Sequence, residues 1–149
     1  MINREIQDFI DKCKEVKLSV TPQRIIIYKE LLGNKSHPSP EDIYNAIKED
    51  NPTISFATVY NTLETFEKYG FIKKVTPLHN KVRYDPVVEP HHHLVCVKCG
   101  KIIDVEPGEI DEIEIPGKVV GKNMYLDYSL RINIVCTECL DKENKNNTN

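Results

Sequence analysis

The stretch that decides the fold is residues 55–84, which read SFATVYNTLETFEKYGFIKKVTPLHNKVRY. Ser55 can cap a helix and Gly70 can end it. Between them, apolar side chains recur at helical spacing: Phe56, Val59, Leu63 and Phe66. Two runs typical of strands follow at 71–75 and 81–84, with a predicted turn at 76–80. The segment therefore predicts an amphipathic helix followed by a two-stranded hairpin.

The face of this helix opposite its apolar stripe is small, polar and nearly uncharged. At about 100° per residue it carries Ala57, Thr58, Asn61 and Thr65, with Tyr60 and Glu64 beside them. A helix that enters the DNA major groove favours short hydrogen-bonding side chains and few carboxylates. The alternative is an ordinary surface helix, although such a face more often carries Lys and Glu.

Three further helices are predicted upstream. Residues 2–16 form an amphipathic pattern with Cys13 on its apolar side, where a small buried core residue is expected. Thr21-Pro22 starts a second helix that Gly33 can end, and Ser39-Pro40 starts a third. Helices followed by a hairpin describe a winged helix-turn-helix domain over residues 1–84. Its wing carries basic side chains suited to phosphate contact: Lys73, Lys74, Lys81 and Arg83.

Prolines at 86 and 90 bound a short linker, so residues 85–90 are predicted to be a hinge. A second domain is expected over 91–140 and a disordered polar tail over 141–149. Residues 102–105 and 118–135 are mostly strand-like. Pro107-Gly108 and Pro116-Gly117 bracket an acidic segment that can hold one helix. The fold class is therefore α+β, with the winged-helix domain first.

Four cysteines form two Cys-x2-Cys motifs in the second domain, Cys96/Cys99 and Cys136/Cys139, with 36 residues between them. Two such motifs in one small domain predict a closed tetrahedral zinc site that is structural, not catalytic. The alternative is two dithiols or unrelated cysteines. Thioredoxin-type redox chemistry is disfavoured because it uses a single motif at a strand-to-helix junction.

Three consecutive histidines precede the first cysteine motif. In an extended segment, His91 and His93 point to one side and His92 to the other. Imidazoles combined with carboxylates such as Asp104 suit ferrous iron, manganese or zinc. Spacing alone does not connect His37 or Asp85 to this cluster, and a run of surface histidines is the alternative.

The net charge of −3 argues by itself against a DNA-binding protein. However, residues 1–84 carry 13 basic and 11 acidic side chains, whereas residues 85–149 carry 7 and 12. A mildly basic first part suits DNA contact. The sequence contains no apolar stretch of about 18 residues and no signal-peptide pattern at its start. We therefore expect a cytoplasmic protein without membrane association, whose thiols stay reduced.

Taken together, several motifs resemble the ferric uptake regulator family: Thr21-Pro22-Gln23-Arg24, Ala57-Thr58-Val59-Tyr60-Asn61, His91-His92-His93-Leu94-Val95-Cys96 and the second cysteine motif. Order and spacing agree over residues 4–140. The resemblance implies a homodimer that binds double-stranded operator DNA through winged helices and dimerises through an α/β domain holding structural Zn²⁺. It also implies a regulatory Fe²⁺ or Mn²⁺ near the hinge, on His37, Asp85, His91, His93 and Asp104. The expected DNA contacts are Arg24, Ala57, Thr58, Tyr60, Asn61, Thr65 and the four basic wing residues.

Within the family, the chain most resembles the peroxide-responsive repressors. It has aspartates at positions 85 and 104, where iron-responsive relatives commonly differ, and Asn61 where many relatives have Arg. The resemblance implies that oxidation of a ligand histidine, His37 or His91, releases iron and then the operator. Such chemistry is stoichiometric, so no enzyme is expected. Pro116-Gly117 departs from the family pattern, which questions a second regulatory-type metal site and the usual dimer interface.

Three alternative functions remain open from the sequence. The first is a repressor that senses iron, manganese or zinc status without sensing peroxide. The second is a metalloenzyme that uses the His/Asp cluster, although no acid or base stands out beside it. The third is a zinc-stabilised interaction module without a DNA role, against which the uncharged helix face argues.

Overall fold

A computed structural model describes residues 2–75 and 81–146 of the chain. It divides into two compact units, residues 1–88 and 89–149. The boundary between the units falls inside the segment that the sequence predicted to be a hinge. The turn expected at 76–80 lies outside the described residues. No helix of the described part is long and apolar enough to cross a membrane.

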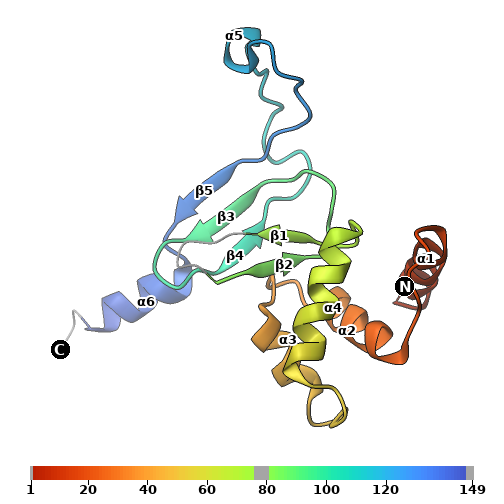
Figure 1. Cartoon of the computed structure of the whole chain (residues 1–149). Coiled ribbons are helices and arrows are strands. Elements are labelled where there is room, and N and C mark those ends of the chain that lie inside the picture. The colour runs from red at the N-terminus through yellow and green to blue at the C-terminus, as the bar shows by residue number, and fades with distance from the viewer. Residues whose placement is uncertain (1, 76–80, 147–149) are drawn as a thin grey trace. The chain divides into compact units, whose positions relative to one another are not determined.

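The first unit consists of four helices followed by a hairpin (Figure 1). Its elements are α1 (Ile2–Glu15), α2 (Pro22–Gly33), α3 (Pro40–Ile47), α4 (Phe56–Lys68), β1 (Lys73–Val75) and β2 (Arg83–Asp85). The two strands pair antiparallel. The side chains of Thr21, Ser39 and Ser55 cap α2, α3 and α4 by accepting a backbone N–H three residues later, which satisfies a free donor at each helix start. All three predicted helix starts are confirmed.

One buried cluster joins the helices of the first unit to the hairpin. The Phe9 ring stacks on Tyr28 with centroids 4.1 Å apart and meets Phe66 edge-on at 5.3 Å. Cys13 is fully buried in this core, as predicted. The prediction that Phe56 belongs to the buried stripe is wrong, since its side chain is 39% exposed. As the first residue of α4 it lies beyond the end of the core, where its ring meets Tyr44 at 5.8 Å.

The second unit is built on a three-stranded sheet of order β4-β3-β5, from β3 (His93–Cys96), β4 (Ile102–Asp104) and β5 (Arg131–Ile134). β4 runs antiparallel and β5 parallel to β3. A short helix, α5 (Gly117–Val120), lies in the long connection from β4 to β5, and α6 (Thr137–Asn146) follows β5. In Figure 1 this connection leaves the sheet and returns to it, carrying α5 near its tip.

Three expectations for the second unit differ from the structure. Of residues 118–135, which were predicted to be mostly strand, only Arg131–Ile134 pairs with the sheet, because the preceding residues lie in the connection. The acidic segment between the two Pro-Gly pairs contains no helix, and helical turns begin only at Gly117. Residues 141–146, expected to be disordered, continue α6. Ion pairs Lys101–Glu138 and Lys98–Glu143 hold this helix against the first cysteine motif.

Candidate metal centres and nucleic-acid interface

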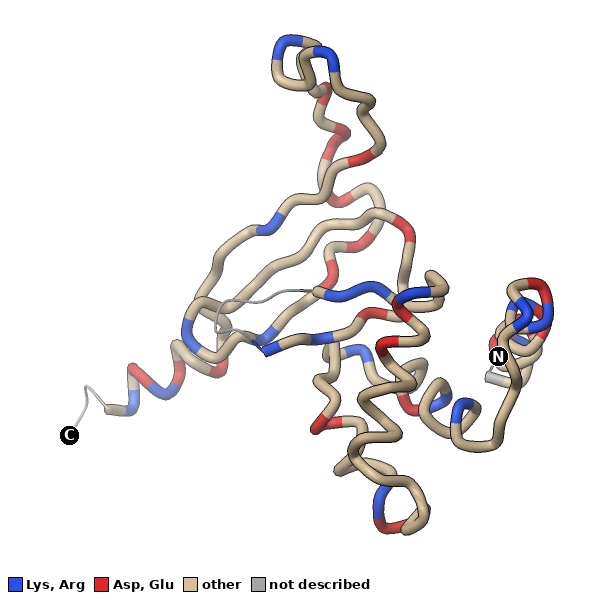
Figure 2. Tube along the Cα trace, in the orientation of Figure 1, with Lys and Arg blue, Asp and Glu red and all other residues tan. Residues whose placement is uncertain are grey.

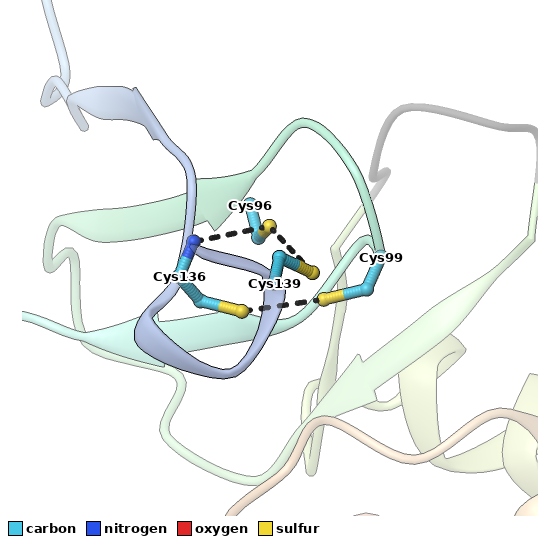
Figure 3. A group of neighbouring side chains, drawn as sticks. All are labelled: Cys96, Cys99, Cys136 and Cys139. Atoms are coloured by element: carbon cyan, nitrogen blue, oxygen red, sulfur yellow. Dashed lines mark hydrogen bonds between the residues drawn. The ribbon is translucent and has the colours of Figure 1, made fainter. Parts of the chain in front are cut away.

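The four cysteines of the second unit converge on one point (Figure 3). The Sγ atoms of Cys99 and Cys136 lie 3.7 Å apart, those of Cys96 and Cys139 lie 3.9 Å apart, and all four lie within 4.8 Å of one another. A zinc ion with four Zn–S bonds of about 2.3 Å requires sulfur–sulfur separations of about 3.8 Å. The side chains therefore fit a tetrahedral zinc site, and the predicted four-cysteine cluster is confirmed.

Local backbone structure brings the two cysteine motifs together. Cys96 ends β3 and pairs with Ile134 of the parallel strand β5, two residues before Cys136. After Cys96 the chain turns back through Gly100, whose φ of 75° favours glycine and whose N–H donates to the Cys96 carbonyl at 2.9 Å. Cys139 lies in the first turn of α6, where its N–H donates to the Cys136 carbonyl at 3.0 Å. Strand pairing thus places one motif beside the other.

Two of the thiols, Cys96 and Cys139, have pKa values shifted in opposite directions. Hydrogen bonds from the backbone N–H groups of Cys136 and Cys99 lower the pKa of Cys96 to about 6. The hydrogen bond with Cys136 and then burial raise the pKa of Cys139 to about 12. One thiolate therefore forms readily, while further negative charge in the cluster is resisted. A bound divalent cation offsets this repulsion, so the electrostatics agree with the geometry in indicating a metal.

In the first unit, His37 and Asp85 lie side by side although 47 residues separate them. His37 Nε2 is 3.3 Å from Asp85 Oδ2, and each residue is only 2% exposed. His37 stands in the loop before α3 with φ of 55°, and Asp85 ends β2. The Tyr84 N–H donates to the Pro38 carbonyl at 3.0 Å, which fixes that loop beside the strand. The pair offers one nitrogen and one oxygen donor.

In the second unit, His91, His93 and Asp104 form another donor set. Asp104 Oδ1 lies 3.3 Å from His91 Nε2 and 3.4 Å from His93 Nε2. The Nδ1 atom of His91 is 2.8 Å from the Glu89 carbonyl, a contact that assigns the proton to Nδ1 and leaves the Nε2 lone pair for a metal. Imidazole and carboxylate donors of this kind suit iron, manganese or zinc.

His92 points away from this set, as the alternation of a strand predicts. Its Nδ1 accepts the Leu130 N–H at 3.1 Å, and its ring stacks on Tyr128 with centroids 5.4 Å apart. The side chain thus packs against the residues that lead into β5. The sequence distinguished this structural histidine from its two neighbours correctly.

Helix α4 presents the face that the sequence singled out for DNA. Ala57, Tyr60 and Asn61 are exposed, while Thr58 and Thr65 are half-buried. In Figure 2 the helix carries no charge over its first turns, and acidic residues appear only toward its end. The Thr65 hydroxyl donates to the Asn61 carbonyl at 2.8 Å, and Thr58 bonds to Ser55. Three of the five residues thus present freely exposed side chains.

The basic residues predicted to contact phosphate fall into two groups. Lys73, Lys74 and Lys81 are exposed, whereas Arg24 and Arg83 are half-buried. The Lys74 ammonium nevertheless lies 3.0 Å from Glu64 and 3.7 Å from Glu67, Arg83 donates to the His37 carbonyl at 3.2 Å, and Arg24 donates to the Ser19 carbonyl. Sequence reasoning missed these partners. The hairpin register pairs Lys74 with Tyr84 and bears on the surroundings of Lys74 alone.

Comparison with known proteins identifies the family and agrees with the fold. The family model described as the ferric uptake regulator family matches residues 15–135. The peroxide operon regulator of Bacillus subtilis (strain 168) is 36% identical over 144 residues, which cover 97% of this chain and 99% of that protein.

Solved structures show the same architecture. The ferric uptake regulator of Francisella tularensis, determined with iron, superposes with a TM-score of 0.64 at 32% identity over 83% of this chain and 95% of that one. The Helicobacter pylori ferric uptake regulator superposes with a TM-score of 0.71, covers 94% of both chains and, at 24% identity, supports the fold. The chain belongs to the ferric uptake regulator family, so it is a metal-dependent transcriptional repressor and not an enzyme.

Proposed function

We propose that this protein is a homodimeric repressor that binds operator DNA while a regulatory ion occupies its His/Asp residues and that releases the DNA when hydrogen peroxide oxidises a ligand histidine. The observation that carries the proposal is a group of imidazole and carboxylate donors that shares no residue with the four-cysteine cluster. These donors are His37 and Asp85 in the first unit and His91, His93 and Asp104 in the second. The similarity over nearly the whole chain to a peroxide operon regulator supports the peroxide response.

The zinc and the regulatory ion would have separate tasks. Cys96, Cys99, Cys136 and Cys139 would hold Zn²⁺ in a closed site that stabilises the second unit. His37 and Asp85 of the first unit, together with His91, His93 and Asp104 of the second, would hold Fe²⁺ or Mn²⁺. Ligands supplied by both units favour one arrangement of the units by binding the ion better in that arrangement than in others.

Operator recognition follows from the fixed arrangement. The two α4 helices of a dimer must stand about one DNA turn apart, or ~34 Å, to enter successive major grooves. Tyr60 and Asn61, which are exposed on α4, would meet base edges, with Ala57, Thr58 and Thr65 beside them. Lys73 and Lys81 would supply salt-dependent affinity for phosphate, and Lys74, Arg83 and Arg24 would line the same surface.

Peroxide sensing depends on the ligand histidines. Ferrous iron held by these residues would supply the redox chemistry that splits hydrogen peroxide, and overall one peroxide oxygen would be added to an adjacent imidazole while the other leaves as water. An oxidised His37 or His91 donates poorly, so the remaining ligands no longer hold the arrangement of the units. Release of the operator follows as a single-turnover event.

A DNA-binding titration with iron and with manganese, before and after peroxide, tests the proposal. The iron form should lose operator binding and gain the mass of one oxygen atom on the peptide that contains His37 or His91. The manganese form should keep both its binding and its mass. An iron form that keeps its operator affinity after peroxide would instead identify a metal-status repressor.

A further inference from the structure

Three consecutive residues of β2 contact two different parts of the first unit, the loop that carries His37 and helix α4. Arg83 donates to the carbonyl of His37 at 3.2 Å, and Asp85 lies 3.3 Å from the His37 ring. The hydroxyl of Tyr84, which stands between these two residues, donates a hydrogen bond to Glu64 Oε1 of α4 at 2.9 Å. One short strand therefore touches both the metal-binding pair and the helix that carries the DNA-facing residues.

The contact between Tyr84 and Glu64 links the position of β2 to the position of α4. Tyr84 is fully buried, and its backbone N–H donates to Pro38, the residue after His37. A hydroxyl donating to a carboxylate forms a charge-assisted hydrogen bond, which is stronger than a neutral one. Because a buried ring has little freedom, a shift of β2 must carry the hydroxyl with it.

Glu64 is held from both strands of the hairpin. Lys74 faces Tyr84 across the β1–β2 pair, and its ammonium lies 3.0 Å from the same Oε1 atom that Tyr84 contacts. Along α4, Glu64 stands three residues after Asn61 and four after Tyr60, so these side chains share one side of the helix. The carboxylate thus connects the hairpin to the edge of the DNA-facing side of α4.

We propose that Tyr84 is a positioning residue that couples metal binding at His37 and Asp85 to helix α4 through Glu64. The inference rests on the proposed function for the assignment of His37 and Asp85 as metal ligands. It goes further in naming the contacts through which metal binding at these two residues affects α4, the helix that carries the DNA-facing residues. Tyr84 touches neither the metal nor the DNA in this role.

Hydrogen exchange of the α4 peptide, measured with and without Mn²⁺, tests the coupling without DNA. In the wild-type protein, Mn²⁺ should slow exchange across residues 56–68. Tyr84→Phe removes only the hydroxyl, so Mn²⁺ affinity should stay within about threefold of the wild-type value while most of the slowing in α4 is lost. Glu64→Gln, at the less buried end of the contact, should reproduce the loss. Tyr28→Phe, the same change elsewhere in the core, should keep the slowing.

Three results would overturn the inference: full metal-induced slowing in Tyr84→Phe, no metal response of α4 in the wild-type protein, or a Tyr84→Phe protein that binds Mn²⁺ more than tenfold more weakly. If Tyr84 has a purely structural role, Tyr84→Phe will alter hydrogen exchange in α4 equally with and without metal, and that result also contradicts the coupling.

Operator titrations of the same proteins separate this inference from the proposed function. Tyr84→Phe should reduce the Mn²⁺-dependent gain in operator affinity by about tenfold. If the wild-type protein shows no such gain, the proposed function fails, while the exchange result still decides the coupling.

Discussion

His93 and Asp104 occupy directly opposed positions on the antiparallel strands β3 and β4, and His93 Nε2 lies 3.4 Å from Asp104 Oδ1. The sheet itself therefore sets this donor pair. Asp104→Ala should keep the fold and the zinc but weaken Mn²⁺ binding by at least tenfold, because the donor set loses its only carboxylate in the second unit. Isothermal titration with Mn²⁺ measures the loss. Glu106→Gln, an exposed carboxyl two residues further on, serves as the control and should bind normally.

His37→Ala should retain zinc and the helical signal but lose metal-dependent operator binding, because the first unit then offers only Asp85 to the ion. His37 already adopts φ of 55°, a conformation that costs an L-residue about 1–2 kcal/mol, so alanine meets the same backbone strain without the contacts of the imidazole. His37→Asn tolerates that conformation better and should show the same loss with less destabilisation. Fluorescence anisotropy with Mn²⁺ reports the binding, and unchanged affinity in both variants would exclude His37 as a ligand.

Cys96→Ser should release the zinc and dissociate the dimer, because it removes one of the four zinc ligands, a thiol whose pKa is lowered to about 6. Zinc content by atomic emission and mass by light scattering check the two effects. Cys13→Ala removes the buried thiol of the first unit and should leave both quantities unchanged. A dimeric, zinc-free Cys96→Ser protein would contradict a structural role for the site.

Lys73 and Lys74 are neighbours with different surroundings, and the salt dependence of operator binding should distinguish them. Lys73→Met should lower the slope of log affinity against log salt by about one, as expected when one phosphate contact is lost. Lys74→Met should change the slope by less than half as much, because the Lys74 ammonium already pairs with Glu64. Equal changes in the two slopes would show that Lys74 leaves Glu64 to bind phosphate.

Asp42 should contribute a pH-dependent part of the stability. Burial raises the pKa of this carboxyl, but hydrogen bonds from the Ser39 backbone N–H and hydroxyl lower it by more, to below the ordinary 3.8. A lowered folded-state pKa stabilises the protein above the unfolded value, and this stabilisation is lost as the pH falls through the folded value. Asp42→Asn should therefore be less stable than wild type at pH 7, by about 1 kcal/mol. In urea unfolding this difference should shrink as the pH falls below about 4.

The parts of the fold that local chemistry determines were predictable from the sequence. Helix starts at Thr21, Ser39 and Ser55 depend only on a side chain and the backbone three residues later, and all three are present. The four-cysteine cluster was predictable because zinc geometry constrains both motifs. The exposure of Phe56 was not, because it depends on where the core ends and not on helical spacing.

Long-range packing explains the remaining differences. A strand pattern over 118–135 cannot tell which residues find a neighbouring strand, and only Arg131–Ile134 pairs with β3. Helix α6 extends through residues expected to be disordered because Lys98 and Lys101 supply partners from another segment. The approach of His37 to Asp85 depends on the Tyr84–Pro38 hydrogen bond, and no local pattern in the sequence reports that contact.

The connection from β4 to β5 leaves the sheet and returns to it at two places that are independently secured. The Ile113 N–H donates to the Tyr128 hydroxyl at 2.7 Å across the connection. Its far end enters β5, which pairs with β3, and Cys136 and Cys139 after β5 contact the Cys96 sulfur at the end of β3. The entropic free-energy cost of closing such a loop rises by only about 0.6 kcal/mol for each doubling of its length. Residues 114–127 are therefore a natural insertion point, where homologues can diverge in length and a reporter peptide can be grafted while the sheet and the thiolate cluster stay intact.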